Sequence, residues 1–233
     1  MNEKTILIWG AGAIGGTLGA YLARAGEDVL LVDIVEPHTR DAVRALRPHL
    51  AENGSVLSAQ NGLNELVIAE EIGVERTVGC FVNFGADWLE PGRILFGNRA
   101  TVAVGEIDGH ITERAKEYHR LLSIFEPQAV LTDNIWGYLW GKLGYGTMLF
   151  ATALTNGTMS ENLASQPHFP VFHRLGREVM AVATARRIRP LGFNGFDPDA
   201  FMPGADEADA RRSDVWIATH AEIAAFVKQE CAR

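Results

Sequence analysis

The sequence predicts an α/β fold in which a doubly wound parallel sheet is followed by a helical domain. Short apolar runs alternate with helical patterns over residues 1–132. This alternation is typical of parallel sheets built from strand–helix–strand units. Helical patterns prevail over residues 133–233, apart from a segment rich in proline and glycine at 190–204. We therefore expect two domains, 1–132 and 133–233.

The first strand–helix–strand unit occupies the N-terminus. The runs Thr5–Trp9 and Asp28–Val32 are almost wholly apolar, which predicts two strands buried on both faces. Between them, Ile14–Ala25 has helical spacing, and Gly26 stands where a helix C-terminus favours a left-handed residue. Because crossovers between parallel strands are right-handed almost without exception, these elements define the start of the sheet.

Further elements continue the alternation as far as residue 132. We expect strands over Ser55–Ala59, Thr77–Phe84, Arg93–Phe96 and Thr101–Gly105, and helices over Thr39–Arg47, Glu65–Ile72 and Thr112–Ile124. The apolar run Ile135–Thr155 then predicts one long buried helix at the start of the second domain.

Composition and charge exclude several classes of protein. Hydrophobic residues make up 47% of the chain and charged residues 21%, which excludes disordered, collagen-like and coiled-coil chains. The net charge is −8 and no basic run occurs, so we expect no nucleic-acid partner. Cys80 and Cys231 lack metal-ligand spacing, and we interpret them as free thiols in a reducing compartment with no bound metal.

Two apolar segments bear on targeting. The run Thr5–Trp9 is short and follows Glu3 and Lys4, so it lacks the pattern of a secretory signal. The run Ile135–Thr155 is long enough to cross a bilayer, but it carries Lys142 near its middle, and no second span shields that charge. We therefore expect a cytoplasmic protein with no membrane partner.

A glycine-rich turn, GAGAIGG at residues 10–16, joins the first strand to the first helix. In this context the GxGxxG pattern is typical of a dinucleotide-binding Rossmann domain, and a glycine turn without a ligand is the alternative. Gly10 permits the tight turn, Gly12 lets the backbone approach the pyrophosphate, and Gly15 lets the helix pack on the strand. The helix N-terminus supplies N–H groups to the phosphates. The turn thus contributes the predicted cofactor-binding residues Gly10, Ala11, Gly12, Ala13, Ile14 and Gly15.

Asp33 ends the second strand, 23 residues after Gly10. An acidic side chain at this place accepts hydrogen bonds from the adenosine ribose, and it repels the 2′-phosphate that distinguishes NADP from NAD. Neither Ile34 nor Val35 supplies an arginine for that phosphate. The predicted cofactor is therefore NAD or NADP, with Asp33 favouring NAD, and a solvated aspartate is the alternative reading.

Lys142 is the only charged residue between Ile135 and Thr155. Its neighbours one turn away on the same face include no counter-ion. A partly buried ammonium is a proton donor near neutral pH and a local cation for an anionic substrate, whereas the alternative is a lysine that extends to solvent. Glycines thin the same helix, so either another helix or a ligand approaches it closely: Gly137, Gly141, Gly144 and Gly146.

Five motifs, in order, resemble the ketopantoate reductase (2-dehydropantoate 2-reductase) family: GAGAIGG at 10–16, QNG at 60–62, FVNFGA at 81–86, EPGRI at 90–94 and LWGKL at 139–143. The resemblance covers about residues 4–185. It implies a Rossmann-type sheet followed by a helical domain of the 6-phosphogluconate dehydrogenase type. It also implies hydride transfer from NAD(P)H to the ketone of a 2-oxo acid and, by analogy, a homodimer.

The resemblance implies catalytic roles for two residues. Lys142 matches the family's general acid, whose ammonium protonates the alkoxide that hydride addition creates. Asn61 of QNG matches an asparagine that lies between cofactor and substrate, so it is also a predicted cofactor-binding residue. The local alternative for Asn61 is an Asn-Gly turn residue after a strand.

Two departures from the family concern the substrate. Gly146 and Phe150 stand where the family carries asparagines that hold the substrate, one and two turns after the lysine. Since neither side chain donates a hydrogen bond, we expect a 2-oxo acid other than, or in addition to, ketopantoate. The predicted substrate-contacting residues are then Lys142, Thr147 and Asn156. The family's late serine and glutamate have no clear match, because Ser213 and Glu222 lie in different surroundings.

The chain is also short in two places. About five residues between Asp33 and Thr39 replace a helix, strands and a cofactor-contacting loop of the family, and Arg212–Ile223 is similarly short. Either the protein is a shortened paralogue or the sequence omits parts of a longer polypeptide. Two other functions therefore remain open: a non-catalytic dinucleotide-binding redox sensor, and another hydroxyacid dehydrogenase of the 6-phosphogluconate dehydrogenase-like class.

Overall fold

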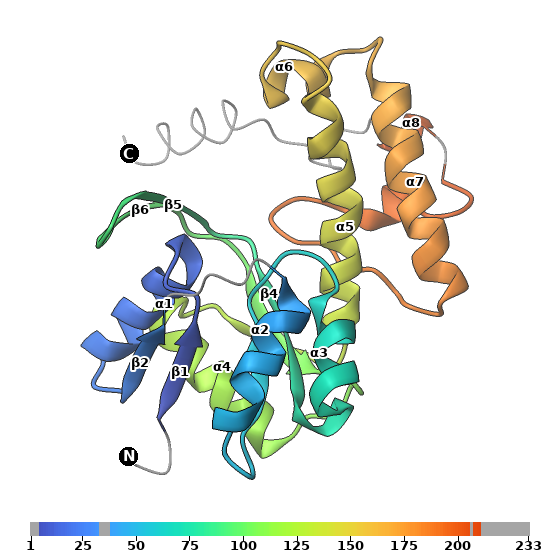
Figure 1. Ribbon diagram of the computed structural model, residues 1–233. Coiled ribbons are helices and arrows are strands. Elements are labelled where there is room, and N and C mark those ends of the chain that lie inside the picture. The colour runs from blue at the N-terminus through green and yellow to red at the C-terminus, as the bar shows by residue number, and fades with distance from the viewer. Residues whose placement is uncertain (1–4, 33–37, 206, 211–233) are drawn as a thin grey trace. The chain divides into compact units, whose positions relative to one another are not determined.

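A computed structural model describes residues 5–32, 38–205 and 207–210 (Figure 1). The chain divides into two compact units, Met1–Ile135 and Trp136–Arg233. The first unit contains all eight strands of the described residues, and the second contains helices only.

The predicted strand–helix–strand unit is present at the N-terminus. Strands β1 (Ile6–Trp9) and β2 (Val29–Val32) pair in parallel, and α1 (Ala13–Arg24) connects them. The prediction that both strands are buried on both faces is wrong. β1 is half-buried along its length, and Leu30 and Leu31 of β2 are about half exposed. These two strands form a sheet of their own within the described residues. A strand is buried on both faces only where other elements cover both faces of its sheet, and the exposure of Leu30 and Leu31 shows that this cover is incomplete.

A second sheet carries the main core of this unit. Its order is β3 (Val56–Ser58), β4 (Thr77–Val82), β7 (Val102–Glu106) and β8 (Val130–Leu131). The sheet is mixed, because β7 runs antiparallel to β4 whereas the other two pairs are parallel. The chain returns from β4 to β7 without a crossover helix, which permits the antiparallel pairing. Every residue of β4 and β7 is buried.

Helices α1 and α4 (Glu113–Phe125) share this core with the second sheet. Leu18 of α1 packs with the buried residues of β4 and β7, and Tyr21 meets Phe125 edge to face, with ring centroids 5.1 Å apart. The small β1–β2 sheet is therefore held to the rest of the unit largely by the apolar face of α1.

Helices α2 (Thr39–Leu46) and α3 (Asn64–Ile72) form a smaller core of Val43, Ile68 and Ile72. On their surface, Arg40 forms ion pairs with Glu70 and Glu71 of α3. These contacts fix α2 beside α3. They thereby hold Thr39, the first residue of α2, close to the turn that precedes α3.

The segment between β4 and β7 is a β-hairpin. Strand β5 (Gly85–Glu90) pairs with β6 (Arg93–Asn98) across a turn at Gly92, whose φ is 77°. The sequence predicted a strand at Arg93–Phe96 but neither β5 nor the two-residue β8. Most of β5 is exposed, and it is stabilised by its pairing with β6, a contact that periodicity does not report.

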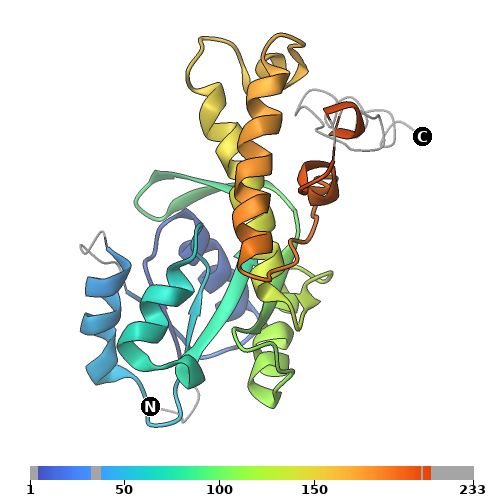
Figure 2. The same cartoon turned by 90° about the vertical axis from the view of Figure 1, so that its right-hand side faces the viewer.

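The second unit is helical, as predicted. Its elements are α5 (Ile135–Thr152), α6 (Met159–Ala164), α7 (Phe169–Ala185) and α8 (Glu207–Ala210). Helix α7 lies along α5 (Figure 2), and Met180 of α7 reaches the helix at Gly144. In the part of the chain that the structure describes, no helix combines the length and the apolar character needed to cross a membrane.

Candidate functional site

The glycine turn lies at the carboxyl ends of β1 and β2. Gly10 has a φ of 109°, and its N–H donates to the carbonyl oxygen of Val32 at 2.8 Å. Helix α1 begins directly afterwards, with Gly12 as its N-cap residue. The turn is thus fixed beside the end of β2, after which Asp33 follows. Asp33 itself lies outside the described residues.

Gly15 and Gly12 meet different surroundings. A Cβ atom at Gly15 would collide with the carbonyl oxygen of Gly10 and come within 3.0 Å of Ile8, so only glycine lets α1 approach β1 this closely. A Cβ atom at Gly12 would meet no atom of the described residues within 4 Å. The turn is therefore closed on the side of Gly15 and open on the side of Gly12, where a ligand can approach the backbone.

The N-terminus of α1 is suited to an anion. No side chain accepts a hydrogen bond at its N-cap, and its first turn contains no acidic residue. The first N–H groups of a helix have no partner within the helix, and they carry the positive end of the helix dipole. The open turn and these donors fit the pyrophosphate of a dinucleotide.

Two substitutions separate packing from binding in this turn. We expect Gly15→Ala to destabilise the protein by about 1–3 kcal/mol, because the new methyl group forces α1 away from β1. We expect Gly12→Ala to change the free energy of unfolding by about 1 kcal/mol or less, and to weaken NADH binding about tenfold or more, since the methyl group projects toward the pyrophosphate. Urea unfolding and a fluorescence titration with NADH measure the two effects.

The two measurements also define the contrary results. A Gly12→Ala variant that binds NADH as tightly as the unmodified protein would place the pyrophosphate elsewhere. A Gly15→Ala variant with unchanged stability would contradict the steric reading of the turn.

Asn61 lies in the turn between β3 and α3, where Gly62 has a φ of 103°. The side-chain amide of Asn64 donates to the Asn61 carbonyl oxygen at 2.8 Å, and the Thr39 hydroxyl donates to Asn64 Oδ1 at 2.8 Å. A hydrogen-bonded chain from the first residue of α2 thereby holds the turn. The Asn61 side chain is exposed and available to a ligand.

Glu65 is a residue that the sequence analysis did not single out. It lies in the first turn of α3 and is fully buried, and neither carboxylate oxygen has a hydrogen-bond partner among the described residues. Burial raises the pKa of Glu65 to about 7, and the nearby backbone N–H groups of Glu65 and Cys80, whose geometry falls short of a hydrogen bond, offset this rise only in part. Its spacing with Ile68 and Ile72, the other buried residues of α3, was the available signal.

Lys142 lies in the second unit, half-buried near the middle of α5. The glycines around it differ in what approaches them. A Cβ atom at Gly141 would collide with the carbonyl oxygen of Leu191, and one at Gly144 with the side chain of Met180. Protein therefore packs on that flank of α5, whereas a Cβ atom at Gly146 would meet nothing within 4 Å in the part of the chain that the structure describes.

The predicted substrate-contacting residues do not gather around Lys142. Thr147 lies five residues along α5, about 140° around the helix from Lys142, and its hydroxyl donates to the Leu143 carbonyl oxygen at 2.5 Å. Asn156 is exposed and follows the end of α5. Ser213 and Glu222 lie outside the described residues.

Comparisons with known sequences identify relatives. The model of the family described as ketopantoate reductase PanE/ApbA matches residues 6–38 and 36–109. A 2-dehydropantoate 2-reductase of Archaeoglobus fulgidus is 24% identical over 223 residues, which covers 78% of this chain and 75% of the relative. The enzyme of the same name from Aquifex aeolicus is 25% identical over 146 residues, which covers 60% of this chain and 46% of the relative.

Solved structures share the fold. A 2-dehydropantoate 2-reductase of Geobacter metallireducens matches with a TM-score of 0.71 at 23% identity, over 99% of this chain and 88% of that chain. A D-mandelate dehydrogenase in complex with NADH matches with a TM-score of 0.71 at 20% identity, over 80% and 75%. These matches confirm the predicted Rossmann-type sheet followed by a helical domain. The family match and the named relatives confirm the resemblance of the five motifs to the ketopantoate reductase family.

Proposed function

We propose that the protein is an NAD(P)H-dependent oxidoreductase that reduces the ketone of a small 2-oxo acid. The observation that carries the proposal is the glycine turn, which is closed by packing at Gly15 and, among the described residues, open at Gly12 beside the first N–H groups of α1. The family and the relatives named 2-dehydropantoate 2-reductase support the reaction class. The D-mandelate dehydrogenase of the same fold supports a substrate range wider than ketopantoate.

The chain's own residues have separate tasks in this reaction. The nicotinamide cofactor supplies the hydride when it is bound. The glycine turn and the N-terminus of α1 hold its pyrophosphate. Lys142 Nζ donates a proton to the former carbonyl oxygen as negative charge develops there, and the same ammonium attracts the anionic substrate to a protein whose net charge is −8. Asn61, held by Asn64, orients the reacting groups with its exposed amide.

Cofactor preference and assembly complete the proposal. Asp33 favours NADH over NADPH, because its carboxylate repels the extra phosphate. By analogy with the family, the helical domain 133–233 binds the substrate and joins two copies into a homodimer in the cytoplasm, whereas domain 1–132 binds the dinucleotide.

The test is the loss of nicotinamide absorbance when a panel of 2-oxo acids is added to the protein with NADH or with NADPH. We expect turnover of at least one acid and a higher kcat/KM with NADH. Asp33→Asn is expected to reduce that preference, since the change removes the repulsion. NADH binding without consumption of any acid would overturn the proposal in favour of a non-catalytic redox sensor. A clear preference for NADPH would refute the role of Asp33 and leave the rest of the proposal standing.

A further inference from the structure

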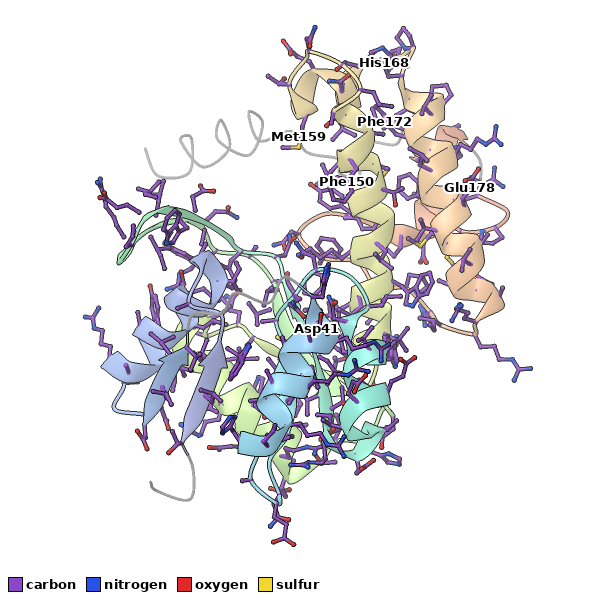
Figure 3. All side chains as sticks on the ribbon, viewed as in Figure 1. Asp41, Phe150, Met159, His168, Phe172 and Glu178 are labelled. Atoms are coloured by element: carbon purple, nitrogen blue, oxygen red, sulfur yellow. The ribbon has the colours of Figure 1, made fainter. Side chains whose placement is uncertain are left out.

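One face of α5 presents an apolar surface next to the predicted general acid. Lys142, Gly146 and Phe150 follow one another at intervals of four residues, which places them on one side of the helix. Phe150 is 83% exposed and projects away from α7 (Figure 3).

The opposite flank of α5 accounts for the packing of the helix. Gly141 and Gly144 admit the backbone at Leu191 and the side chain of Met180, and Met148 is buried. Tyr145 is also engaged, because its ring packs edge to face against Phe193 with centroids 5.7 Å apart. The face of Gly146 and Phe150 is therefore not needed to assemble the second unit, as far as the described residues show.

The side chains of this face beyond Lys142 are all apolar. From Lys142 toward the C-terminus of α5 the face consists of Gly146, Leu149 and Phe150, none of which has a side-chain hydrogen-bond donor or acceptor. Gly146 leaves room beside the lysine, and Phe150 borders that room with an aromatic ring. A ligand held at Lys142 by its carbonyl oxygen, with its carbon chain extended toward Gly146, would place that chain against apolar surface. A hydroxyl group on that chain would lose water there without gaining a partner.

We propose that Phe150 is a specificity-determining residue that makes this protein a reductase of 2-oxo acids with apolar, branched or aromatic side chains, in preference to hydroxylated ones. The inference rests on the proposed function, because it concerns the substrate of the same lysine. Gly146 provides the space for the side chain, and Phe150 provides the apolar contact. Discrimination arises from the unpaired hydroxyl of the disfavoured acid.

Two substrates isolate the effect of a single hydroxyl group. Trimethylpyruvate and ketopantoate differ only in that one methyl group of the former carries a hydroxyl in the latter. We expect kcat/KM for trimethylpyruvate to exceed that for ketopantoate by roughly 10- to 100-fold, and phenylglyoxylate to be reduced as well. In Phe150→Asn, the amide offers the hydroxyl a partner, so we expect the ratio to fall about tenfold or more.

A matched control is available on a different helix. Val182 of α7 is 48% exposed, so Val182→Asn makes a similar apolar-to-amide change away from the proposed face on α5. We expect that variant to keep the substrate ratio within about twofold. Because both positions are exposed, both variants should fold, and thermal unfolding followed by circular dichroism verifies this.

The outcomes separate the inference from the proposed function. A preference for ketopantoate, or an equal change of the ratio in both variants, overturns the inference and leaves the reductase intact. Binding of NADH with no turnover of any of the three acids overturns the proposed function and the inference with it.

Discussion

Lys142→Met is expected to lower kcat for reduction of the 2-oxo acid by about 100- to 10,000-fold, and to leave the affinity for NADH within about twofold. Methionine keeps the length and the apolar stem of the side chain but provides no proton for the developing alkoxide. We expect α5 to keep its packing in this variant, because Gly141 and Gly144 lie on the flank that contacts protein. Steady-state kinetics and a fluorescence titration with NADH measure the two quantities.

Lys116→Met is the matched control for this substitution. Lys116 lies on α4 in the first unit, half-exposed and paired with Glu113 at 2.6 Å. The same chemical change there should leave kcat and NADH affinity unaltered, since a surface ion pair contributes at most about 1 kcal/mol to stability. A Lys142→Met variant that keeps the rate of the unmodified protein would show that the lysine only extends to solvent.

Glu65 is expected to make the protein less stable as the pH rises toward and through neutrality. Its pKa is about 7 in the fold against 4.5 as the ordinary value, so the folded state binds the proton more tightly than the unfolded state. The stability that the protonated carboxyl provides is complete below the unfolded value and is lost as the pH passes the folded value. The full loss amounts to about 3 kcal/mol.

Glu65→Gln removes this titration while it keeps the shape of the side chain. We expect the variant to exceed the original protein in free energy of unfolding by up to about 3 kcal/mol near pH 8, and the difference to shrink toward about pH 5. Urea unfolding across this range measures the difference. Glu52→Gln, an exposed change before β3, is the control and should show no such trend. A constant difference between Glu65→Gln and the original protein would mean that Glu65 does not titrate there.

Most helices and strands could be predicted from the local pattern of apolar and polar residues. The helices and most strands have the residue types and spacing of elements that bury one face, so α1, α3, α4 and α5 were predicted within a few residues. The burial of β1 and β2 was not predictable in this way. An apolar strand is buried only when other elements cover it, and Leu30 and Leu31 lie in a sheet of two strands.

The candidate site also combines features that follow from local sequence with features that depend on contacts between distant residues. The requirement for glycine at residue 15 is local, because the obstructing carbonyl oxygen belongs to Gly10 in the same turn. The support of Asn61 is not local, since Thr39 and Asn64 are 25 residues apart in the sequence. Glu65 was missed because polar residue types are expected outside the core, and its burial depends on how α3 packs against the neighbouring strand.

The separation of the two sheets has a consequence for the motions of the protein. Within the described residues, no ladder of hydrogen bonds joins β1 and β2 to the larger sheet. The module of β1, α1 and β2 can therefore open without breaking the hydrogen bonds of that sheet. Its attachment runs through α1, at Leu18 and Tyr21. We therefore expect β1, α1 and β2 to exchange their amide hydrogens as one cooperative unit that is less protected than β4 and β7. A dinucleotide held by its glycine turn would slow that exchange, so that part of the binding free energy is used to keep the module closed.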